Sequence, residues 1–251
     1  MLKVLEKSFG ILEAVALRAP LSSTALELAA QLDINRSSCS RLLRELCDAG
    51  YLQPLPRRRG YLPAPRLLTL ANAAGFRQRL LDCARPIADR CAAESRNSVV
   101  LAILHDRRRY VLYHRNGNPE VKIVLDRLAF DDIYETATGA VLAAALPEEE
   151  ALEIYRSSPP ARSVCAARNG KELLQKLAAI RKSDLFFASK PEAYQRVYAA
   201  PVMEDGVCTA ALGISIPARE YSAAYHRRIC GILRNAAREI GVAVSRVSAV
   251  G

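Results

Sequence analysis

Residues 23–62 have the sequence STALELAAQLDINRSSCSRLLRELCDAGYLQPLPRRRGYL, and this stretch decides the fold of the N-terminal region. It predicts two short helices around a tight turn, followed by a β-hairpin with arginines at its tip. Thr24 and Glu27 have the spacing of a capping box, in which a hydroxyl and a carboxylate bind two backbone N–H groups at a helix start. The apolar stripe expected on the buried side of this first helix consists of Leu26, Ala29, Ala30 and Leu32.

Three residues are suited to the special backbone positions of the turn and the second helix. Asp33 tolerates the left-handed geometry of a tight corner, Asn35 is a good N-cap, and Gly50 can end the helix as a C-terminal glycine does. The inner side expected from helical spacing consists of Cys39, Leu42, Leu43 and Leu46. The outer, polar side consists of Asn35, Arg36, Ser37, Ser38, Ser40, Arg41 and Arg44.

This polar side and the hairpin tip have the chemistry of a DNA-binding surface. Arginine binds guanine edges or phosphates, and serine binds either. The hairpin is expected to act as a wing against phosphates, through Arg57, Arg58, Arg59 and Tyr61. Residues 35–66 hold seven Arg and two acidic residues, a net charge of +5. An ordinary solvated pair of helices with a charged loop is the alternative, but the wing and the local charge favour DNA binding.

The composition of the chain agrees with a polyanionic partner. The 251 residues include 36 Lys and Arg against 26 Asp and Glu, which gives a formal net charge of +10. Such a balance favours nucleic acid or an anionic membrane surface. A chain of this length, with 51% hydrophobic residues, can bury a large core and is expected to hold two domains.

The N-terminal segment is predicted to be an amphipathic helix. Glu6, Lys7 and Glu13 interrupt it in a way that a signal peptide does not tolerate. No apolar run of the chain approaches the roughly 20 residues that span a bilayer. We therefore expect a cytoplasmic protein with no membrane partner. The residues expected on the inner side of this helix are Val4, Leu5, Phe9, Leu12 and Val15.

Cysteine and histidine show no metal-ligand spacing. The cysteines lie at positions 39, 47, 83, 91, 165, 208 and 230, and the histidines at 105, 114 and 226. Most of the cysteines fall on apolar stripes and are expected to be small core residues, with a redox-sensing thiol as the alternative. No catalytic serine motif, phosphate-binding glycine loop or paired catalytic carboxylates are recognisable. We predict no catalytic residues, no metal, no cofactor and no enzyme activity.

Beyond the hairpin, two helices are expected to form a connector. Residues 66–74 read as a helix that ends near Gly75, and residues 76–95 as a longer one that Pro86 kinks or divides. Residues 97–251 mix strands and helices, so an antiparallel sheet with helices packed on it, an α+β arrangement, is expected. The predicted strands cover residues 98–104, 110–114, 121–125, 186–189, 196–203 and 207–216. The predicted helices cover residues 138–146, 148–156, 170–183 and 221–247.

The whole chain resembles the IclR (isocitrate lyase regulator) family of transcriptional regulators. The blocks that carry the resemblance are LEKSFGILEAV, LAAQLDINRSSCSRLLRELCDAGYL, YETATGAVLAA, AYQRVYAAPV, VCTAALGISIPARE and the final long helix. The resemblance implies dimers or tetramers that control operons for uptake or breakdown of carbon sources, often organic or aromatic acids. The implied domains are a winged helix-turn-helix at 1–65, linker helices at 66–95, and a GAF-like effector-binding domain with an antiparallel sheet at 96–251.

The chain departs from the family pattern at three places. Asp33-Ile34 stands where the family usually has Gly-Leu at the corner of the helix-turn-helix. Ala140 stands where Lys or Arg is common, and Ile216 where the family has the glycine of Ser-Gly-Pro. These changes leave the expected fold intact and leave the ligand open.

The strand at 210–216 and the helix start at 135–139 are the expected ligand-binding elements. Strand alternation puts Ala211, Gly213 and Ser215 on one face, which is small and offers a hydroxyl. Backbone N–H groups and the Thr138 hydroxyl at a helix start suit a carboxylate. Thr136 or Thr138 acting only as a helix cap is the alternative, and spacing alone favours it. The resemblance implies effector contacts, and the candidate set is Ile123, Ala137, Thr138, Gly139, Gln195, Val197, Gly213 and Ser215.

The sequence therefore predicts a sequence-specific DNA-binding regulator whose affinity for a double-stranded operator is modulated by a small organic-acid effector. We expect a homodimer or homotetramer that controls a catabolic or uptake operon. Two alternatives remain open. One is an α+β enzyme that binds small molecules, and the other is a basic-surface interaction protein that lacks specific DNA binding.

Overall fold

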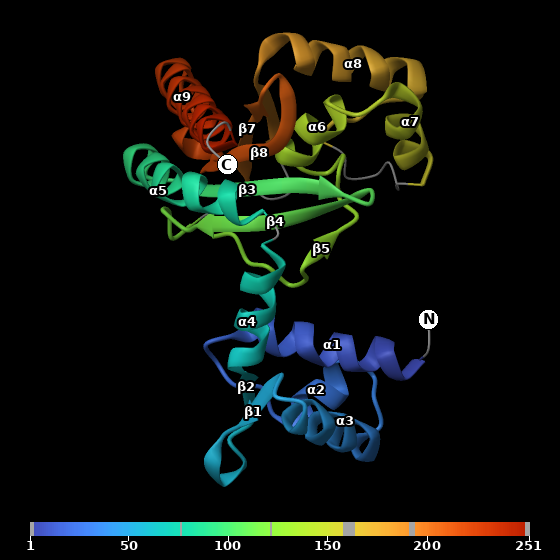
Figure 1. Cartoon of the computed structure of the whole chain (residues 1–251). Coiled ribbons are helices and arrows are strands. Elements are labelled where there is room, and N and C mark those ends of the chain that lie inside the picture. Colours follow the sequence, from blue (N-terminus) through green and yellow to red (C-terminus); the bar gives the residue numbers. More distant parts are fainter. Residues whose placement is uncertain (1–2, 76, 121, 158–163, 191–193, 249–251) are drawn as a thin grey trace. The chain divides into compact units, whose positions relative to one another are not determined.

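The computed structural model describes residues 3–75, 77–120, 122–157, 164–190 and 194–248 (Figure 1). The chain forms two compact units. Unit 1 comprises Met1–Gln78 and Leu125–Leu128, and unit 2 comprises Arg79–Val124 and Ala129–Gly251.

Unit 1 is a helix-turn-helix followed by a small β-hairpin. Its elements are α1 (Lys3–Arg18), α2 (Ala25–Gln31), α3 (Arg36–Asp48), β1 (Leu52–Pro54), a 3-10 turn (Pro56–Arg58), β2 (Tyr61–Pro63) and α4 (Pro65–Ala74). The antiparallel pairing of β1 with β2 confirms the predicted hairpin. The predicted connector is divided between the units, because α4 lies in unit 1 and nearly all of α5 in unit 2.

The turn between α2 and α3 forms as its residues predict. Asp33 has a φ of 50°, in the left-handed region. Asn35 caps α3, because its side-chain oxygen accepts a hydrogen bond of 2.9 Å from the Ser37 backbone N–H. Gly50, with a φ of 77°, follows the last residues of α3 and turns the chain toward β1.

The capping box of α2 is also present. The Glu27 N–H donates to the Thr24 hydroxyl at 3.2 Å, and the Thr24 N–H donates to the Glu27 carboxylate at 2.7 Å. Arg18 adds an ion pair of 2.9 Å to the same carboxylate. The hydrogen bonds from Thr24, followed by the contact with Arg18, lower the pKa of Glu27 from 4.5 to about 2.

The core of unit 1 confirms the predicted inner side of α3 and corrects those of α1 and α2. Cys39, Leu42 and Leu43 are buried and Leu46 is half-buried. On α2, Leu28 is buried in place of Leu26, which is 55% exposed, and Ala30 is also exposed. On α1 the buried residues are Ile11, Ala14 and Val15, whereas the predicted residues Val4, Leu5 and Phe9 are exposed. Each of these helices offers more than one apolar stripe, and the contacts with β2 and α3 select the one that is buried.

Unit 2 is an α+β unit built on one six-stranded antiparallel sheet. Its strands are β3 (Ser98–His105), β4 (Arg108–Arg115), β5 (Ala129–Phe130), β6 (Phe186–Lys190), β7 (Gln195–Glu204) and β8 (Val207–Pro217), in the order β5-β4-β3-β8-β7-β6. Its helices are α5 (Gln78–Ser95), α6 (Ala137–Ala144), α7 (Glu148–Ser157), α8 (Gly170–Ser183) and α9 (Ala223–Ser248).

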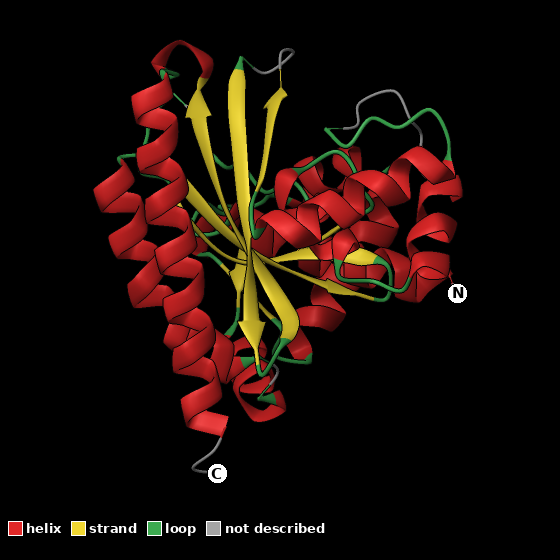
Figure 2. Cartoon of the chain, turned by 90° about the horizontal axis from the view of Figure 1, so that it is seen from above, coloured by secondary structure: helices red, strands yellow, loops and turns green. Residues whose placement is uncertain are grey.

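Helices cover both faces of this sheet (Figures 1 and 2). On one face, α5 and α9 pack on a core that includes Leu212, Ile214 and Ile216 of β8. On the other face, α6 and α8 pack on Ala211 and other small residues, and α7 packs against α8. The predicted alternation along β8 is therefore confirmed, and α6 can approach the sheet closely because its side of β8 is small.

One strand that was predicted in unit 2 is not formed. Residues 122–125 form neither helix nor strand, and the sheet edge is instead made by β5, which pairs with β4; residue 121 lies outside the described residues. Apolar residues at 121–125 resemble a strand locally, but a strand forms only where a neighbour supplies hydrogen bonds. Of the two outcomes predicted for Pro86, division of the helix is wrong, since α5 runs through Pro86 as one helix. Of the described helices, none is long and apolar enough to cross a membrane.

Candidate nucleic-acid interface and effector site

The polar side of α3 is open to solvent. Arg36, Arg41 and Arg44 are exposed, and none of them forms an ion pair with any residue that the structure describes. Ser37 and Ser40 are exposed, and Ser38 is half-buried. The three guanidinium groups are thus available for an external acceptor such as a guanine edge or a phosphate.

Asn35 and Ser37 also have a structural role at the start of α3. The Asn35 side-chain oxygen accepts from the Ser37 N–H at 2.9 Å and from the Ser37 hydroxyl at 2.7 Å. Because this oxygen is occupied, Asn35 can offer DNA its amide N–H groups only. The Asn35 amide N–H groups therefore remain as donors at the helix start, which suits phosphate oxygens.

The hairpin tip holds its arginines in an ordered turn. The Leu55 N–H donates to the Gly60 carbonyl at 2.8 Å and closes the loop. The Ser22 hydroxyl donates to the Arg59 carbonyl, also at 2.8 Å, and ties the tip to the segment before α2. Arg57 and Arg59 are exposed; the side chain of Arg58 is not among those described. The backbone thus fixes the points at which the side chains of Arg57 and Arg59 leave the turn.

Tyr61 and Gly60 anchor the wing to the rest of unit 1. The Tyr61 backbone exchanges two hydrogen bonds with Ser23, of 2.9 and 3.1 Å, and its ring is half-buried against the core. A Cβ atom at Gly60 would lie 2.6 Å from the Ser23 carbonyl oxygen, and the φ of Gly60 is 109°. Glycine is therefore required there. The structure gives Tyr61 an anchoring position, which the sequence did not distinguish from a DNA contact.

Arg66, at the start of α4, binds the carbonyl end of α3. The Arg66 guanidinium donates to the Ala49 carbonyl at 2.6 Å and lies 5.0 Å from the centre of the Tyr51 ring. A cation at the carbonyl end of α3 is favourable because the helix dipole is negative there. Arg66 thus ties α4 to the end of α3, and its charge is partly used inside unit 1.

The candidate effector residues of α6 lie at its first turn. Thr136 is the N-cap, and its hydroxyl accepts from the Gly139 N–H at 3.1 Å. The cap alternative is therefore confirmed for Thr136. Ala137 and Thr138 are 5% and 4% exposed, and their N–H groups have no hydrogen-bond partner in the part of the chain that the structure describes. Two buried N–H donors without an acceptor favour the binding of an anionic group.

Beneath this turn, the sheet brings the other candidates together. A Cβ atom on Gly213 would lie 2.7 Å from the Thr138 methyl group, so glycine lets Thr138 rest on β8. Ser215 is two positions along β8 from Gly213 and pairs with Val197 of β7. Gln195 lies two positions beyond Val197, paired with Pro217. The structure thus places seven of the eight candidates on α6 and on the adjoining strands β7 and β8.

Ile123 stands apart from that group. It lies in a loop rather than on the expected strand. Its N–H donates to the Asn116 side-chain oxygen at 2.7 Å, and its carbonyl accepts from the Asn116 amide at 3.2 Å. The described hydrogen bonds therefore connect Ile123 with the end of β4.

The sequence did not single out an ion pair close to the start of α6. Arg109 of β4 donates to both carboxylate oxygens of Asp132, at 2.8 and 2.6 Å, and is only 6% exposed. Its guanidinium also lies 4.7 Å from the centre of the Phe130 ring. The sequence features that could have indicated this ion pair are the run of arginines at 107–109 and the acidic residues at 131–132. These residues become partners only when β5 pairs with β4.

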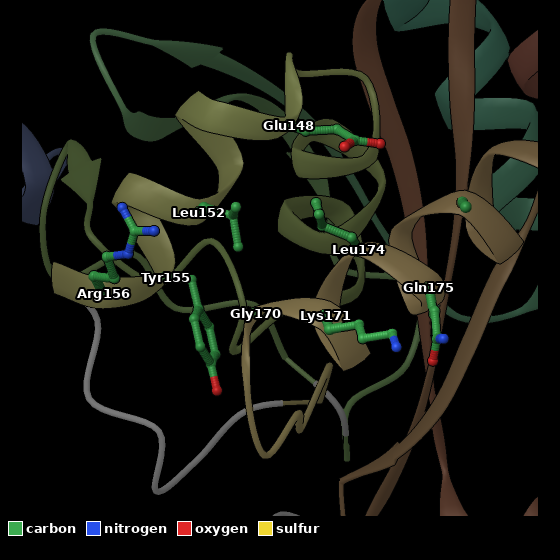
Figure 3. Close-up of a pocket in the computed structure, with 9 residues that line it drawn as sticks. Glu148, Leu152, Tyr155, Arg156, Gly170, Lys171, Leu174 and Gln175 are labelled. Carbon is green, nitrogen blue, oxygen red and sulfur yellow. The ribbon is translucent and has the colours of Figure 1, made fainter.

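A separate groove of about 680 Å³ lies between α7 and α8 (Figure 3). Leu152 and Leu174 are among its apolar lining residues, whereas Glu148, Arg156 and Lys171 bring charges of both signs. None of the residues that line it belongs to the candidate effector set. This groove therefore does not contribute to the site at the start of α6.

Comparisons with known proteins agree with this arrangement. The model of the bacterial transcriptional regulator IclR C-terminal domain matches residues 74–242, and that of the IclR helix-turn-helix domain matches residues 4–56. No curated protein matches the chain.

Solved structures share the fold over nearly the whole chain. An IclR homolog from Microbacterium hydrocarbonoxydans, complexed with 4-hydroxybenzoate, has a TM-score of 0.75 at 24% identity and covers 96% of this chain and 98% of its own. The IclR regulator from Alicyclobacillus acidocaldarius has a TM-score of 0.74 at 18% identity, with coverage of 97% and 99%. The IclR of Thermotoga maritima has a TM-score of 0.69 at 19% identity, with coverage of 98% and 100%. At these identities the likeness concerns the fold alone.

Proposed function

Since the chain belongs to the IclR family of bacterial transcriptional regulators, we propose that it binds a DNA operator and that a small organic acid modulates this binding. DNA binding is assigned to residues 1–65 and effector binding to residues 96–251, joined by the helices at 66–95. We propose no enzymatic activity for it. Because its partner is chromosomal DNA, we expect it to act in the cytoplasm.

The observation that carries the DNA-binding role is the exposed side of α3 with its unpaired arginines. Arg36, Arg41 and Arg44 occupy successive turns of a helix that α2 braces, the arrangement in which a recognition helix enters the major groove. The wing arginines supply contacts to phosphate that do not depend on sequence. Specific and general DNA binding thus fall to different elements of unit 1.

A mobility-shift assay with the intergenic DNA upstream of the chain's own gene tests this role. We expect a discrete complex that survives an excess of unrelated duplex DNA, because base contacts add to the phosphate contacts. Equal competition by unrelated DNA would contradict sequence-specific recognition. It would favour a general basic-surface interaction instead.

The effector role is supported by the unpaired N–H groups of Ala137 and Thr138 above the small face of β8. Carboxylates bind at such helix starts. A structural relative is complexed with 4-hydroxybenzoate, so aromatic acids belong in the first test. We propose a carboxylate that accepts from these two groups, with the remainder of the effector lying over Gly213, Ser215 and Val197.

Calorimetry of the full chain with a panel of organic acids, 4-hydroxybenzoate included, tests the effector site. Thr138→Val keeps the shape of the side chain and removes its hydroxyl. Ser215→Ala removes the second hydroxyl of the proposed site. We expect both variants to weaken the binding of an acid that the wild-type chain binds. No heat from any acid, or unchanged binding in both variants, would contradict the site.

A second copy of the chain is part of the proposal. No residue of α4 is buried, and Leu68 and Leu70 are 66% and 57% exposed. An isolated helix of this length is marginal in water, so a covering partner is expected. A homodimer would supply that cover and would present two copies of α3 to paired operator half-sites.

A further inference from the structure

One end of β7 has no neighbouring strand on its outer side in the part of the chain that the structure describes. β6 pairs with β7 only from Gln195 to Ala199, whereas β7 continues along β8 to Glu204. Pro201 lies in this uncovered part, and proline is tolerated at a sheet edge because it has no N–H to donate. Figure 1 shows α9 and α8 on either side of β7. Since no strand extends β6 here, space remains between these helices and the end of β7.

Two hollows of about 420 Å³ each meet at this end of β7. The first lies against the second half of α9, and the second against α8 and the end of α6. Asp184, Pro201 and Met203 line both hollows, so the two form one continuous surface around the edge of the sheet. We call the surface around these three residues the β7-end surface.

Small residues on α9 make room for the first hollow. Ala237, Gly241 and Ser245 line it, and their spacing of four residues puts them on one side of the helix. A Cβ atom on Gly241 would lie 2.2 Å from the Met203 carbonyl oxygen. Glycine therefore lets α9 rest directly on β7, and the small side chains beside it leave the hollow open.

Four arginines and one aspartate line the two hollows, which gives the β7-end surface a net charge of +3. The arginines are Arg181, Arg234, Arg238 and Arg246. Arg234 donates to the Ser183 carbonyl at 3.3 Å. The other three form no ion pair with any residue that the structure describes. An acidic partner would supply the carboxylates that these guanidinium groups lack.

Exposed apolar side chains accompany these charges. Met203, Val207 and Val242 are 43%, 64% and 45% exposed, and each of them lines at least one of the hollows. Large apolar side chains that gather on a surface mark sites of interaction. Methionine and arginine together are typical of protein–protein interfaces.

The extent of the β7-end surface fits a helix better than a small molecule. From Arg234 to Arg246, α9 extends about 18 Å at about 1.5 Å per residue, and the apolar side chains belong to both hollows. A small organic acid fills one hollow, whereas an amphipathic helix can lay its apolar side along both. A second copy of this chain is a poorer match in charge, because the chain itself carries a net charge of +10.

We propose that the β7-end surface binds an acidic amphipathic helix of another protein. The apolar side of that helix packs on Met203 and Val242, and its carboxylates accept from Arg238 and Arg246. In a chain that also binds DNA, this surface brings the other protein to the operator. That consequence rests on the proposed function, whereas the binding of the helix does not.

Fluorescence anisotropy of a labelled peptide with the full chain tests the proposal. The probe is a synthetic peptide of about 14 residues, about 21 Å long as a helix, with leucine along one side and glutamate and alanine elsewhere. We expect saturable binding of this peptide and no binding when lysine replaces its glutamates. A peptide with serine in place of leucine should bind about tenfold more weakly or worse, because it buries little apolar surface.

Matched variants of α9 locate the binding site. Arg238→Glu is expected to weaken binding of the peptide about tenfold or more, because it replaces attraction by repulsion. Arg227→Glu makes the same change at an exposed arginine that lines neither hollow, and its affinity should stay within about twofold of the wild type. Val242→Ser should weaken binding about threefold or more. Its control is Val247→Ser, at a valine that is 51% exposed and lines neither hollow.

Three results overturn the proposal. The first is no binding of the peptide, or equal binding by the wild type, Arg238→Glu and Val242→Ser. The second is equal binding of the serine peptide, because the surface would then take anions without an apolar contact. The third is a lower mass of Arg238→Glu, but not of Arg227→Glu, by light scattering without peptide, because a second copy would then occupy the surface. None of these measurements uses an operator, so a failure of the proposed function is seen separately in the mobility-shift assay.

Discussion

At the residue scale, α6 can pack close to β8 because Gly213 has no side chain. A Cβ atom there would lie 2.7 Å from the Thr138 methyl group and 3.2 Å from both the Tyr198 carbonyl oxygen and a Val100 methyl group. No rotamer change relieves all three contacts, because one of them is with backbone. The shape of the proposed effector site is thus set by this glycine.

Gly213→Ala is expected to destabilise the chain by about 1–3 kcal/mol, as overpacking of a close-packed interior does. It should also weaken acid binding, since α6 must move away from β8. Urea unfolding measures the first effect and calorimetry the second. Gly231→Ala is the control, because this helical glycine of α9 has nothing within 4 Å of the added Cβ and alanine favours a helix. Equal stability of the two variants would contradict the described contact.

The capping box predicts a dependence of α2 on pH. The pKa of Glu27 is lowered from 4.5 to about 2, so folding favours its ionised form. The stabilisation by this carboxylate is therefore fully present above pH 4.5 and is lost as the pH falls through about 2. We expect the wild-type α2 to be more stable than that of Glu27→Gln by a constant free energy near neutral pH. This free-energy difference should vanish as the pH falls from 4.5 to about 2. Hydrogen exchange of the α2 amides measures it, and a difference that persists at pH 2 would contradict the assignment.

At the element scale, we expect α3 and the wing to divide DNA recognition between them. The guanidinium of Arg41 projects from a rigid helix, and those of Arg57 and Arg59 from a turn pinned by Ser22. A contact from a helix in the groove carries sequence information, and a contact with phosphate does not. The two elements should therefore respond differently to substitution.

We expect Arg41→Ala to weaken binding to the operator by about 1–3 kcal/mol and to leave unrelated DNA nearly unaffected. Joint replacement of Arg57 and Arg59 by Ala is expected to weaken binding to all DNA and to lower the slope of log K against log salt by about two. Titration at several salt concentrations measures both effects. An unchanged slope would contradict the assignment of the wing to phosphates.

The exposed leucines of α4 predict that a second copy covers this element. We expect Leu68→Lys with Leu70→Lys to raise the dimer dissociation constant by about tenfold or more, because burying one leucine contributes about 1.5–3 kcal/mol. Light scattering after size-exclusion chromatography measures the change. Leu26→Lys, at a leucine of α2 that is 55% exposed, is the control. If the α4 variants remain dimeric at the same concentrations as the control, some other surface joins the copies.

At the scale of the whole molecule, the proposed regulation requires that acid binding at the start of α6 change the DNA binding of α3. The chain connects the two units through α5 and again through Leu125–Leu128. The second connection leads within a few residues to Asp132 and the cap of α6. Along the chain, the segment from Leu128 to the cap of α6 at Thr136 is therefore only a few residues long.

Features that depend on near neighbours in the chain could be predicted from the amino-acid sequence. The capping box at Thr24, the corner at Asp33, the hairpin tip and the alternation along β8 follow from residues a few positions apart, so local rules predict them. The composition of the polar side of α3 belongs to the same group, since helical spacing alone assembles it. Local sequence rules were therefore sufficient to predict the turn, the caps and the exposed polar side of α3, on which the proposal of DNA binding rests.

Where the sequence offers more than one apolar stripe or more than one possible strand, contacts between residues distant in the chain select the one that forms. α1 buries Ile11 rather than Phe9 because its partners β2 and α3 meet that side. The sheet edge is β5 rather than residues 122–125 because β4 pairs with Ala129 and Phe130 of β5. Arg109 and Asp132 are 23 positions apart along the chain and meet only when that edge forms. Such contacts join residues distant in sequence, and their free energy appears only once the chain has folded.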